Sequence, residues 1–147
     1  MAGEDLIRIA QENLAAFNSA SWDRFKASLT PDSVYEELAT QRRIQGADGI
    51  VAANQGWKSA FPDAKGTETS VVASGDTVVQ ESTWSGTNTG PMETPGGTMP
   101  ATGKSASVRA VMVSTFDGDK IKETHHYFDM MSMLQQLGVM PSGAATA

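Results

Sequence analysis

Residues 105–128 read SASVRAVMVSTFDGDKIKETHHYF, two runs rich in β-branched residues on either side of Asp117-Gly118-Asp119. Such runs around a glycine-containing turn predict a β-hairpin. A second pair of runs, Thr67–Ser74 and Thr77–Trp84, flanks Gly75-Asp76, which is another two-residue hairpin signal. We therefore expect long antiparallel strands in the second half of the chain.

The first half and the end of the chain carry helical patterns instead. Helices are predicted at 4–18, from Ser21 to the Pro31-Asp32 pair, from Gly46 to Pro62, and at Met130–Leu137 before Gly138. A strand is predicted at Ser33–Leu38, and the segment Gly86–Gly103, rich in Gly, Pro and Thr, is a long loop of the kind that is usually functional or mobile.

This order of elements predicts an α+β domain. N-terminal helices pack on a curved antiparallel sheet, and a short C-terminal helix closes the chain. The concave face of such a sheet can enclose a ligand pocket. We expect 1–140 to form a single domain and 141–147 to be a disordered tail.

The composition limits the kinds of molecule that the protein is expected to bind. The chain has 147 residues, a net charge of −6 and no cysteine. Disulfides and thiolate catalysis are thereby excluded, and the acidic balance argues against nucleic acid and anionic membranes as partners. The start of the chain, Met-Ala-Gly-Glu-Asp, lacks the basic and apolar segments of a signal peptide, and no apolar run reaches membrane-spanning length. We expect a cytoplasmic protein that binds a small, neutral or weakly polar molecule.

The last predicted strand carries most of the acid–base chemistry. Strand alternation separates Glu123, His125, Tyr127 and Asp129 from Thr124, His126 and Phe128. We expect His125, Tyr127 and Asp129 to face the pocket, with Phe128 packed against the helices, although the reverse remains open.

A carboxylate at Asp129 in an apolar pocket would have a raised pKa and could act as a general acid or base. The alternative for Asp129 is an N-cap of the following helix. Adjacent strand residues face opposite ways, so the His125-His126 pair does not predict a metal site.

Further candidates for substrate binding come from the middle of the chain. Asn88 can donate a hydrogen bond to a carbonyl or enolate oxygen, or it is an amide chosen for a glycine-rich turn. Glu81 is either a buried second carboxylate or part of a solvated strand face. Trp57, Trp84 and Met112 determine the size of the pocket, whereas other aromatic residues such as Tyr35 are assigned to the core.

Several motifs resemble the SnoaL-like polyketide cyclases, which belong to the NTF2-like superfamily of cone-shaped α+β domains. The resemblance runs from Leu14 to Gly138 and is strongest from Trp84 onward. Its motifs are Trp84-Ser-Gly-Thr-Asn-Thr-Gly-Pro, Pro100-Ala-Thr-Gly-Lys, Phe116-Asp-Gly-Asp-Lys-Ile, and Tyr127-Phe-Asp followed by Leu134-Gln-Gln-Leu-Gly.

The resemblance implies intramolecular aldol condensation of a polyketide-like substrate without metal or cofactor. It also implies that the catalytic acid/base is the aspartate at the end of the last long strand, which is Asp129 here. The family's frequent Gly-Thr-His is Gly86-Thr87-Asn88 in this chain, so the proton-shuttling role of that histidine does not carry over. A second histidine with a supporting role in some members falls near Ser114–Thr115, where no side chain titrates, and His125 is the residue that would substitute for it. Pairing of sheet faces into a homodimer or higher homo-oligomer is a further expectation from the superfamily.

Three functional hypotheses follow. The first is the aldol-type cyclase, in which Asp129→Asn removes most turnover. The second is an isomerase or an epoxide hydrolase acting on a small apolar substrate, and hydrolysis would make Glu81 important. The third is a non-catalytic binding module, for which a closed cone filled with side chains would be the signature. A polar cluster inside an open pocket favours the two enzymes.

Overall fold

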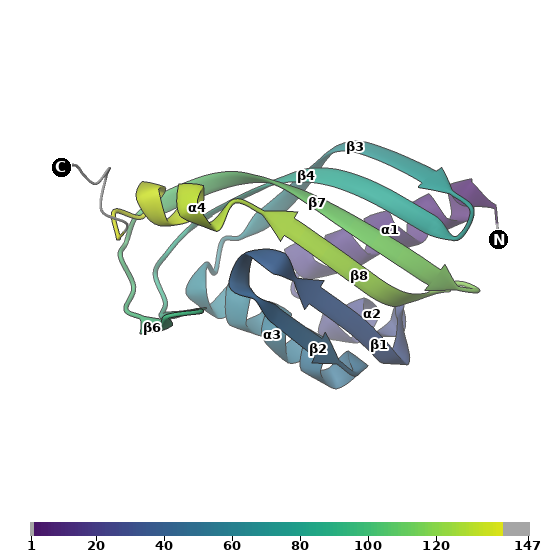
Figure 1. The fold of residues 1–147 in the computed structure, drawn as a ribbon, viewed down its shortest axis with the longest axis horizontal. Helices are drawn as coiled ribbons and strands as arrows, with labels where there is room; N and C mark the ends of the chain where they lie inside the picture. Colours follow the sequence, from purple (N-terminus) through teal and green to yellow (C-terminus); the bar gives the residue numbers. More distant parts are fainter. Residues whose placement is uncertain (1, 140–147) are drawn as a thin grey trace.

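The structure is a computed structural model that describes residues 2–139. Helices α1 (Gly3–Asn18), α2 (Trp22–Ala27) and α3 (Ala47–Ala60) lie against one face of a six-stranded sheet (Figure 1). Helix α4 (Met130–Gln136) follows the last strand at one end of the sheet. The α+β class is thus confirmed, while the tail predicted at 141–147 lies outside the described residues.

The sheet is mixed, and its strand order in space is β2-β1-β8-β7-β4-β3. Its strands are β1 (Leu29–Glu37), β2 (Arg42–Gln45), β3 (Lys65–Ser74), β4 (Thr77–Thr87), β7 (Ser105–Asp117) and β8 (Lys120–Phe128). A short turn of 3-10 helix, η1 (Leu38–Thr40), joins β1 to β2, and strands β5 (Met92–Thr94) and β6 (Gly97–Met99) form a separate hairpin.

Both predicted hairpins are confirmed. β3 and β4 meet at Ser74 opposite Thr77, and β7 and β8 meet at Asp117 opposite Lys120. The turns hold Gly118 at φ 61° and Gly75 at φ 59°, a left-handed conformation that glycine adopts without steric cost. The two hairpins then pair through β4 and β7, which builds the long antiparallel part of the sheet.

The sheet, expected to be antiparallel, is mostly so, and the exception is one junction at which β1 runs parallel to β8. In this register Glu36 lies opposite His125 and Glu37 lies opposite His126. The pairing joins strands from the two ends of the chain, so no local sequence pattern marks it. It places a carboxylate and an imidazole on neighbouring strands.

Strand β2 was not predicted. It reads Arg42-Arg-Ile-Gln45 and contains a single apolar side chain, so it has no alternating pattern. The strand forms because Gln41 adopts a left-handed conformation at φ 59°, which turns the chain back to pair with β1. This return places Arg42 directly opposite Glu37.

The core consists of two apolar clusters. One packs α1, α2 and α3 on the sheet through residues such as Leu6, Phe17 and Ile50. The other joins α4 to β7 and to the end of α3 through Phe61, Met133 and their neighbours. Among residues 2–139 no helix is long and apolar enough to cross a membrane.

The segment predicted as a long loop is more ordered than expected, since it contains the β5–β6 hairpin and a buried clamp. Asn88 is fully buried, and its amide donates to the carbonyl oxygens of Ala60 and Gly90. Its side-chain oxygen accepts from the backbone N–H and the hydroxyl of Thr102. Asn88 therefore ties the loop to the end of α3.

Gly90 is needed where this loop passes α3. A Cβ at Gly90 would lie 2.1 Å from the carbonyl oxygen of Ser59, which is far inside van der Waals contact. We expect Gly90→Ala to lower the free energy of unfolding by about 1–3 kcal/mol, the usual cost of overpacking. Urea denaturation measures this, with Gly96→Ala as the control because its nearest neighbour would be 3.8 Å away. Equal stability of the two variants would contradict the close approach.

Candidate active site

A pocket lies on the helix-covered side of the sheet, and its wall is mainly aromatic. Its aromatic lining residues are Phe17, Tyr35, Trp57, Phe61, Trp84 and Phe128, with His126 among them. The cavity volume is about 70 Å³, well above the roughly 10–15 Å³ that one water needs and below the ~150 Å³ of a cavity that binds benzene. A smaller cavity of about 30 Å³ extends to Met112. It shares five lining residues with the main pocket, namely Phe17, Tyr35, Asn54, Trp84 and His126.

His126 is the imidazole that reaches this pocket. It is 7% exposed and lies on the inner face of β8 with Thr124 and Phe128. His125 points to the opposite face, where its Nε2 is 2.7 Å from a Glu123 carboxylate oxygen. The expectation that His125, Tyr127 and Asp129 face the pocket is therefore wrong. The reverse orientation, which the sequence left open, places His126 and Phe128 in the pocket wall.

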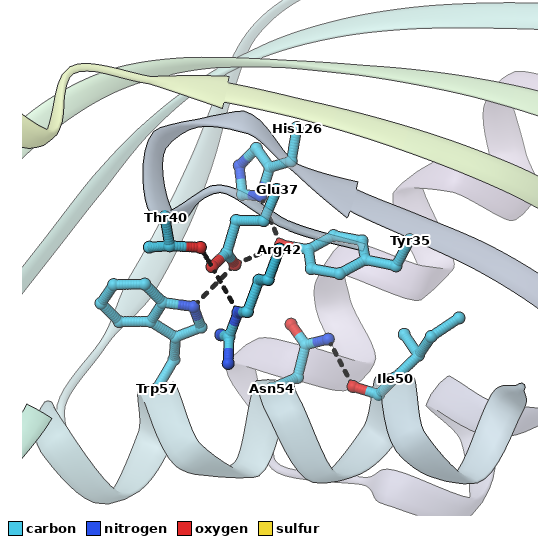
Figure 2. Close-up of polar contacts among 8 residues, drawn as sticks. All are labelled: Tyr35, Glu37, Thr40, Arg42, Ile50, Asn54, Trp57 and His126. Carbon is cyan, nitrogen blue, oxygen red and sulfur yellow. Dashed lines mark hydrogen bonds and ion pairs between the residues drawn. The ribbon is translucent and has the colours of Figure 1, made fainter. Parts of the chain in front are cut away.

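Glu37 is a fully buried carboxylate beside the pocket (Figure 2). Its oxygens accept hydrogen bonds from Tyr35 Oη at 2.7 Å, Trp57 Nε1 at 2.8 Å and Arg42 Nε at 2.9 Å, and also from the Thr40 hydroxyl. β1, η1, β2 and α3 each supply part of this cluster. Every element around the β1–β2 turn thus contributes to holding a single carboxylate.

Burial by itself raises the pKa of the Glu37 carboxyl, since a charge is costly in an apolar interior. The four hydrogen-bond donors and the Arg42 charge outweigh burial, so the pKa lies below its ordinary value of 4.5. Glu37 is therefore ionised at neutral pH. Burial and the adjacent carboxylate raise the pKa of Tyr35 well above 10.0, which keeps its hydroxyl protonated.

Hydrogen bonds connect this cluster to His126. The Tyr35 hydroxyl lies 2.8 Å from His126 Nδ1, and Trp84 Nε1 donates to His126 Nε2 at 3.2 Å. Burial lowers the pKa of His126 from 6.5 to about 4, against the raising effect of Glu37. The imidazole is therefore neutral near pH 7 and can accept a proton at Nε2.

Asn54 is a further polar side chain in the pocket wall. Its amide nitrogen donates to the Ile50 carbonyl oxygen one turn earlier in α3, at 2.9 Å. This bond fixes the amide so that its oxygen points away from Ile50, toward the Glu37 cluster (Figure 2).

Asp129, expected as the catalytic carboxylate, is exposed at the start of α4. Its side chain accepts a hydrogen bond from the Ser132 backbone N–H at 3.0 Å, which is an N-cap. Tyr127 is 45% exposed on the outer face, and Glu81 is exposed on the outer side of β4. None of these three side chains lines the pocket.

The other predicted binding residues divide into two groups. Trp57 and Trp84 line the main pocket, and Met112 lines the smaller cavity. Asn88 is turned into the loop clamp and lines neither cavity. The amide predicted to bind an enolate oxygen thus uses its hydrogen bonds within the fold.

Sequence reasoning missed Tyr35, Glu37, Thr40 and Arg42 as functional candidates. A signal for two of them was present, because Ser33, Tyr35 and Glu37 share one parity of a predicted strand. Assigning Tyr35 to the core should have placed Glu37 in the interior as well, where a carboxylate requires partners. Arg42 carried no such signal, since β2 was not recognised.

Among residues 2–139 no group of three or more His, Asp and Glu side chains is placed to hold a metal ion.

Fold and pocket together define an NTF2-like domain with a buried polar cluster beside an aromatic cavity. The sequence matches the family of SnoaL-like polyketide cyclases over residues 7–137, so the chain belongs to that family. The resemblance noted in the sequence motifs is thereby confirmed. A search of curated proteins finds no match.

Solved structures agree with this fold. A protein from Jannaschia sp. CCS1 assigned as a SnoaL-like polyketide cyclase superposes with a TM-score of 0.84 at 18% identity, covering 95% of each chain. IdmH from Streptomyces antibioticus, assigned as a polyketide cyclase, gives 0.77 at 25% identity over 91% of this chain and 99% of its own. A ketosteroid isomerase-like protein from Catenulispora acidiphila, in complex with trimethylamine, gives 0.77 at 18% identity over 94% and 97%.

Proposed function

We propose that this protein is a cofactor-independent enzyme that removes a proton from the carbon next to a carbonyl and closes a ring by an aldol-type step. The observation that carries the proposal is the neutral imidazole of His126, which presents Nε2 in an apolar pocket. Family membership supports ring closure as the reaction. In this proposal His126 takes the role that the sequence suggested for Asp129.

The reaction begins when His126 Nε2 accepts the α-proton of the bound substrate. The resulting enolate carbon attacks a second carbonyl of the same molecule, so that one carbon–carbon bond forms. The new alkoxide then takes the proton back from the imidazolium. The protein is returned to its starting state, and no external oxidant or reductant is required.

Trp84 is placed to stabilise the enolate. Its indole N–H lies 3.2 Å from His126 Nε2, so a donor and an acceptor are side by side in the pocket wall. In a carbonyl compound the oxygen, which accepts a hydrogen bond, lies close to the α-hydrogen that the base removes, so the substrate matches this donor–acceptor pair. When a substrate replaces the Trp84–His126 hydrogen bond, the indole can donate to the developing oxyanion while His126 receives the proton.

The low pKa of His126 suits this reaction in one respect and opposes it in another. A pKa of about 4 keeps the imidazole unprotonated throughout the neutral range, so it is always ready to accept. It also makes the imidazole a weak base, since the most effective base has a pKa near the working pH. A negative enolate beside the imidazolium raises that pKa as the reaction proceeds.

The small cavity indicates that a small carbonyl compound, or one short segment of a larger substrate, is enclosed. The trimethylamine complex of the Catenulispora acidiphila relative supports a small organic molecule as the occupant of such a fold. The aromatic lining favours apolar groups around the reacting carbonyls.

Proton exchange tests the proposal without knowledge of the natural substrate. A suitable probe is a linear diketone with three methylene carbons between its carbonyls, which can close to a six-membered ring. In deuterated water, NMR should show α-hydrogen exchange faster than in buffer, followed by the cyclic product. A ketone of similar size whose α-carbons are fully substituted, and which therefore has no α-hydrogen to exchange, is the control.

Each outcome of this experiment has a distinct meaning. Exchange with ring closure supports the cyclase, whereas exchange with a rearranged open-chain product supports an isomerase. Saturable binding of the probe, seen as a change in tryptophan fluorescence, without exchange above buffer would contradict catalysis and favour the binding module.

A further inference from the structure

Four side chains form an unbroken line of hydrogen bonds from the pocket wall to the buried carboxylate. The line runs from Trp84 to His126, then to Tyr35, and ends at Glu37, with heavy-atom distances of 3.2, 2.8 and 2.7 Å. Both ends of the line have a fixed direction. An indole N–H can only donate, and an ionised carboxylate can only accept.

The directions between the two ends follow from the number of protons available. Tyr35 has one hydroxyl proton, and its bond to Glu37 uses that proton. The Tyr35 oxygen is then an acceptor toward His126, so Nδ1 must carry the imidazole proton. Nε2, which accepts from Trp84, must be unprotonated.

We propose that Glu37 is a positioning residue that, acting through Tyr35, holds His126 in the tautomer protonated at Nδ1 and so keeps Nε2 free to accept a proton. The inference rests on the proposed function for its consequence, because only a base needs a free Nε2. The geometry itself concerns the resting protein and can be tested without any substrate.

Tyr35 alone would not select this tautomer. A tyrosine hydroxyl both donates and accepts, so it could equally donate to Nδ1 and leave the proton on Nε2. The Glu37 carboxylate removes that freedom by taking the hydroxyl proton. Its own position is fixed by Arg42, Trp57 and Thr40, which donate to it from three other elements.

Glu37 also has an electrostatic effect on His126. It is ionised and buried, and its charge raises the pKa of the imidazole. The effect is therefore largest when His126 becomes an imidazolium, which is the state that follows proton abstraction. Arg42 contacts the other carboxylate oxygen of Glu37, Oε1, and lowers the pKa of that carboxyl, which opposes transfer of the proton to Glu37.

The tautomer can be read directly from the nitrogen chemical shifts of the imidazole. The chain contains two histidines, so a His125→Gln background leaves His126 as the single signal. At neutral pH we expect a protonated, pyrrole-like Nδ1 and an unprotonated, pyridine-like Nε2. A pyridine-like Nδ1 in this protein would overturn the inference at once.

Three variants separate the contributions of the line. Tyr35→Phe removes the acceptor of the Nδ1 proton, so the pyridine-like shift should move at least partly to Nδ1. Glu37→Gln can donate to Tyr35 and turn its hydroxyl toward His126, which should make the Nε2-protonated form the major one. Trp84→Phe should leave the Nδ1-protonated form in place, because the Tyr35 side sets it.

Glu36→Gln is the matched control. Glu36 is the neighbouring carboxylate on the same strand, but it faces the outer side, 3.8 Å from His125. Its replacement should leave the His126 shifts unchanged. If Trp84→Phe reverses the tautomer while Tyr35→Phe does not, Trp84 sets it and the proposal is wrong.

These results are independent of catalysis. The tautomer pattern together with absent α-proton exchange would leave the positioning intact and remove the proposed function. Exchange activity in a protein whose His126 proton lies on Nε2 would leave an active enzyme and remove the positioning by Glu37. Glu37→Gln loses a charge opposite Arg42 and is the variant most prone to unfold, and in that event wild type, Tyr35→Phe and Trp84→Phe still decide the inference.

Discussion

Replacing His126 by glutamine should slow enzyme-dependent α-proton exchange by about 10²–10⁴-fold, the usual contribution of a general base. Glutamine keeps a polar side chain of similar reach but cannot carry a transferable proton near neutral pH. The variant should bind the diketone probe with little change, because the aromatic wall of the pocket remains. Initial exchange rates by NMR at saturating probe measure the effect.

Two other replacements are the controls for that result. His125→Gln changes a histidine of the same strand that points to Glu123 on the outer face. Asp129→Asn changes the residue that the family resemblance marks as catalytic, but whose side chain caps α4. We expect both to keep most of the exchange activity. Loss of activity in Asp129→Asn with full activity in His126→Gln would reverse the assignment.

The second large effect concerns stability at acidic pH. The pKa of His126 falls from 6.5 in the unfolded chain to about 4 in the folded protein, because burial disfavours the imidazolium. Between these two values the unfolded state binds more protons than the folded state, so the free energy of unfolding decreases as the pH falls. At about 1.4 kcal/mol per pKa unit, the loss by pH 4 is about 3 kcal/mol.

Urea denaturation at a series of pH values from neutral to about 4.5 measures this slope, which should begin near the unfolded pKa of about 6.5. His126→Gln should lose most of it, since glutamine does not titrate. His125→Gln should retain it. A slope that survives unchanged in His126→Gln would show that another group is responsible and that the imidazole is less buried than the structure indicates.

Glu37 acts in a different part of the pH range. Its folded pKa lies below 4.5, so its contribution to stability is complete above the unfolded pKa and is lost as the pH falls through the folded value. The effect of His126 begins near pH 6.5, above the value of about 4.5 at which the effect of Glu37 begins. The two effects can therefore be separated by their onset.

Local patterns were sufficient for most of the secondary structure. The two hairpins, the helices at the N-terminus, the helix that begins after Gly46 and the short helix after Asp129 were all predicted from periodicity and turn residues. Each of these depends on neighbours in sequence. The fold family followed from the motifs beginning at Trp84, which lie in the same local segments.

The candidate site was predicted less well, and the reason lies in the strand period. His125 and His126 are adjacent, so one of them must face the pocket, but alternation cannot say which. The bulge where β8 pairs with β7, between Ile121 and Glu123, adds to this uncertainty, because Ile121 and His126 are both buried although their numbers differ in parity. Only the packing of β8 under the helices selects His126.

By itself the sequence determined an α+β domain of the SnoaL-like family with a pocket that contains Trp57 and Trp84. The tertiary structure alone decided the chemistry of that pocket. Parallel pairing of β1 with β8 brings Glu37 beside His126, residues that are far apart in the chain. A contact of this kind depends on how the first and last strands meet in the sheet, and neither strand carries a signal for the other.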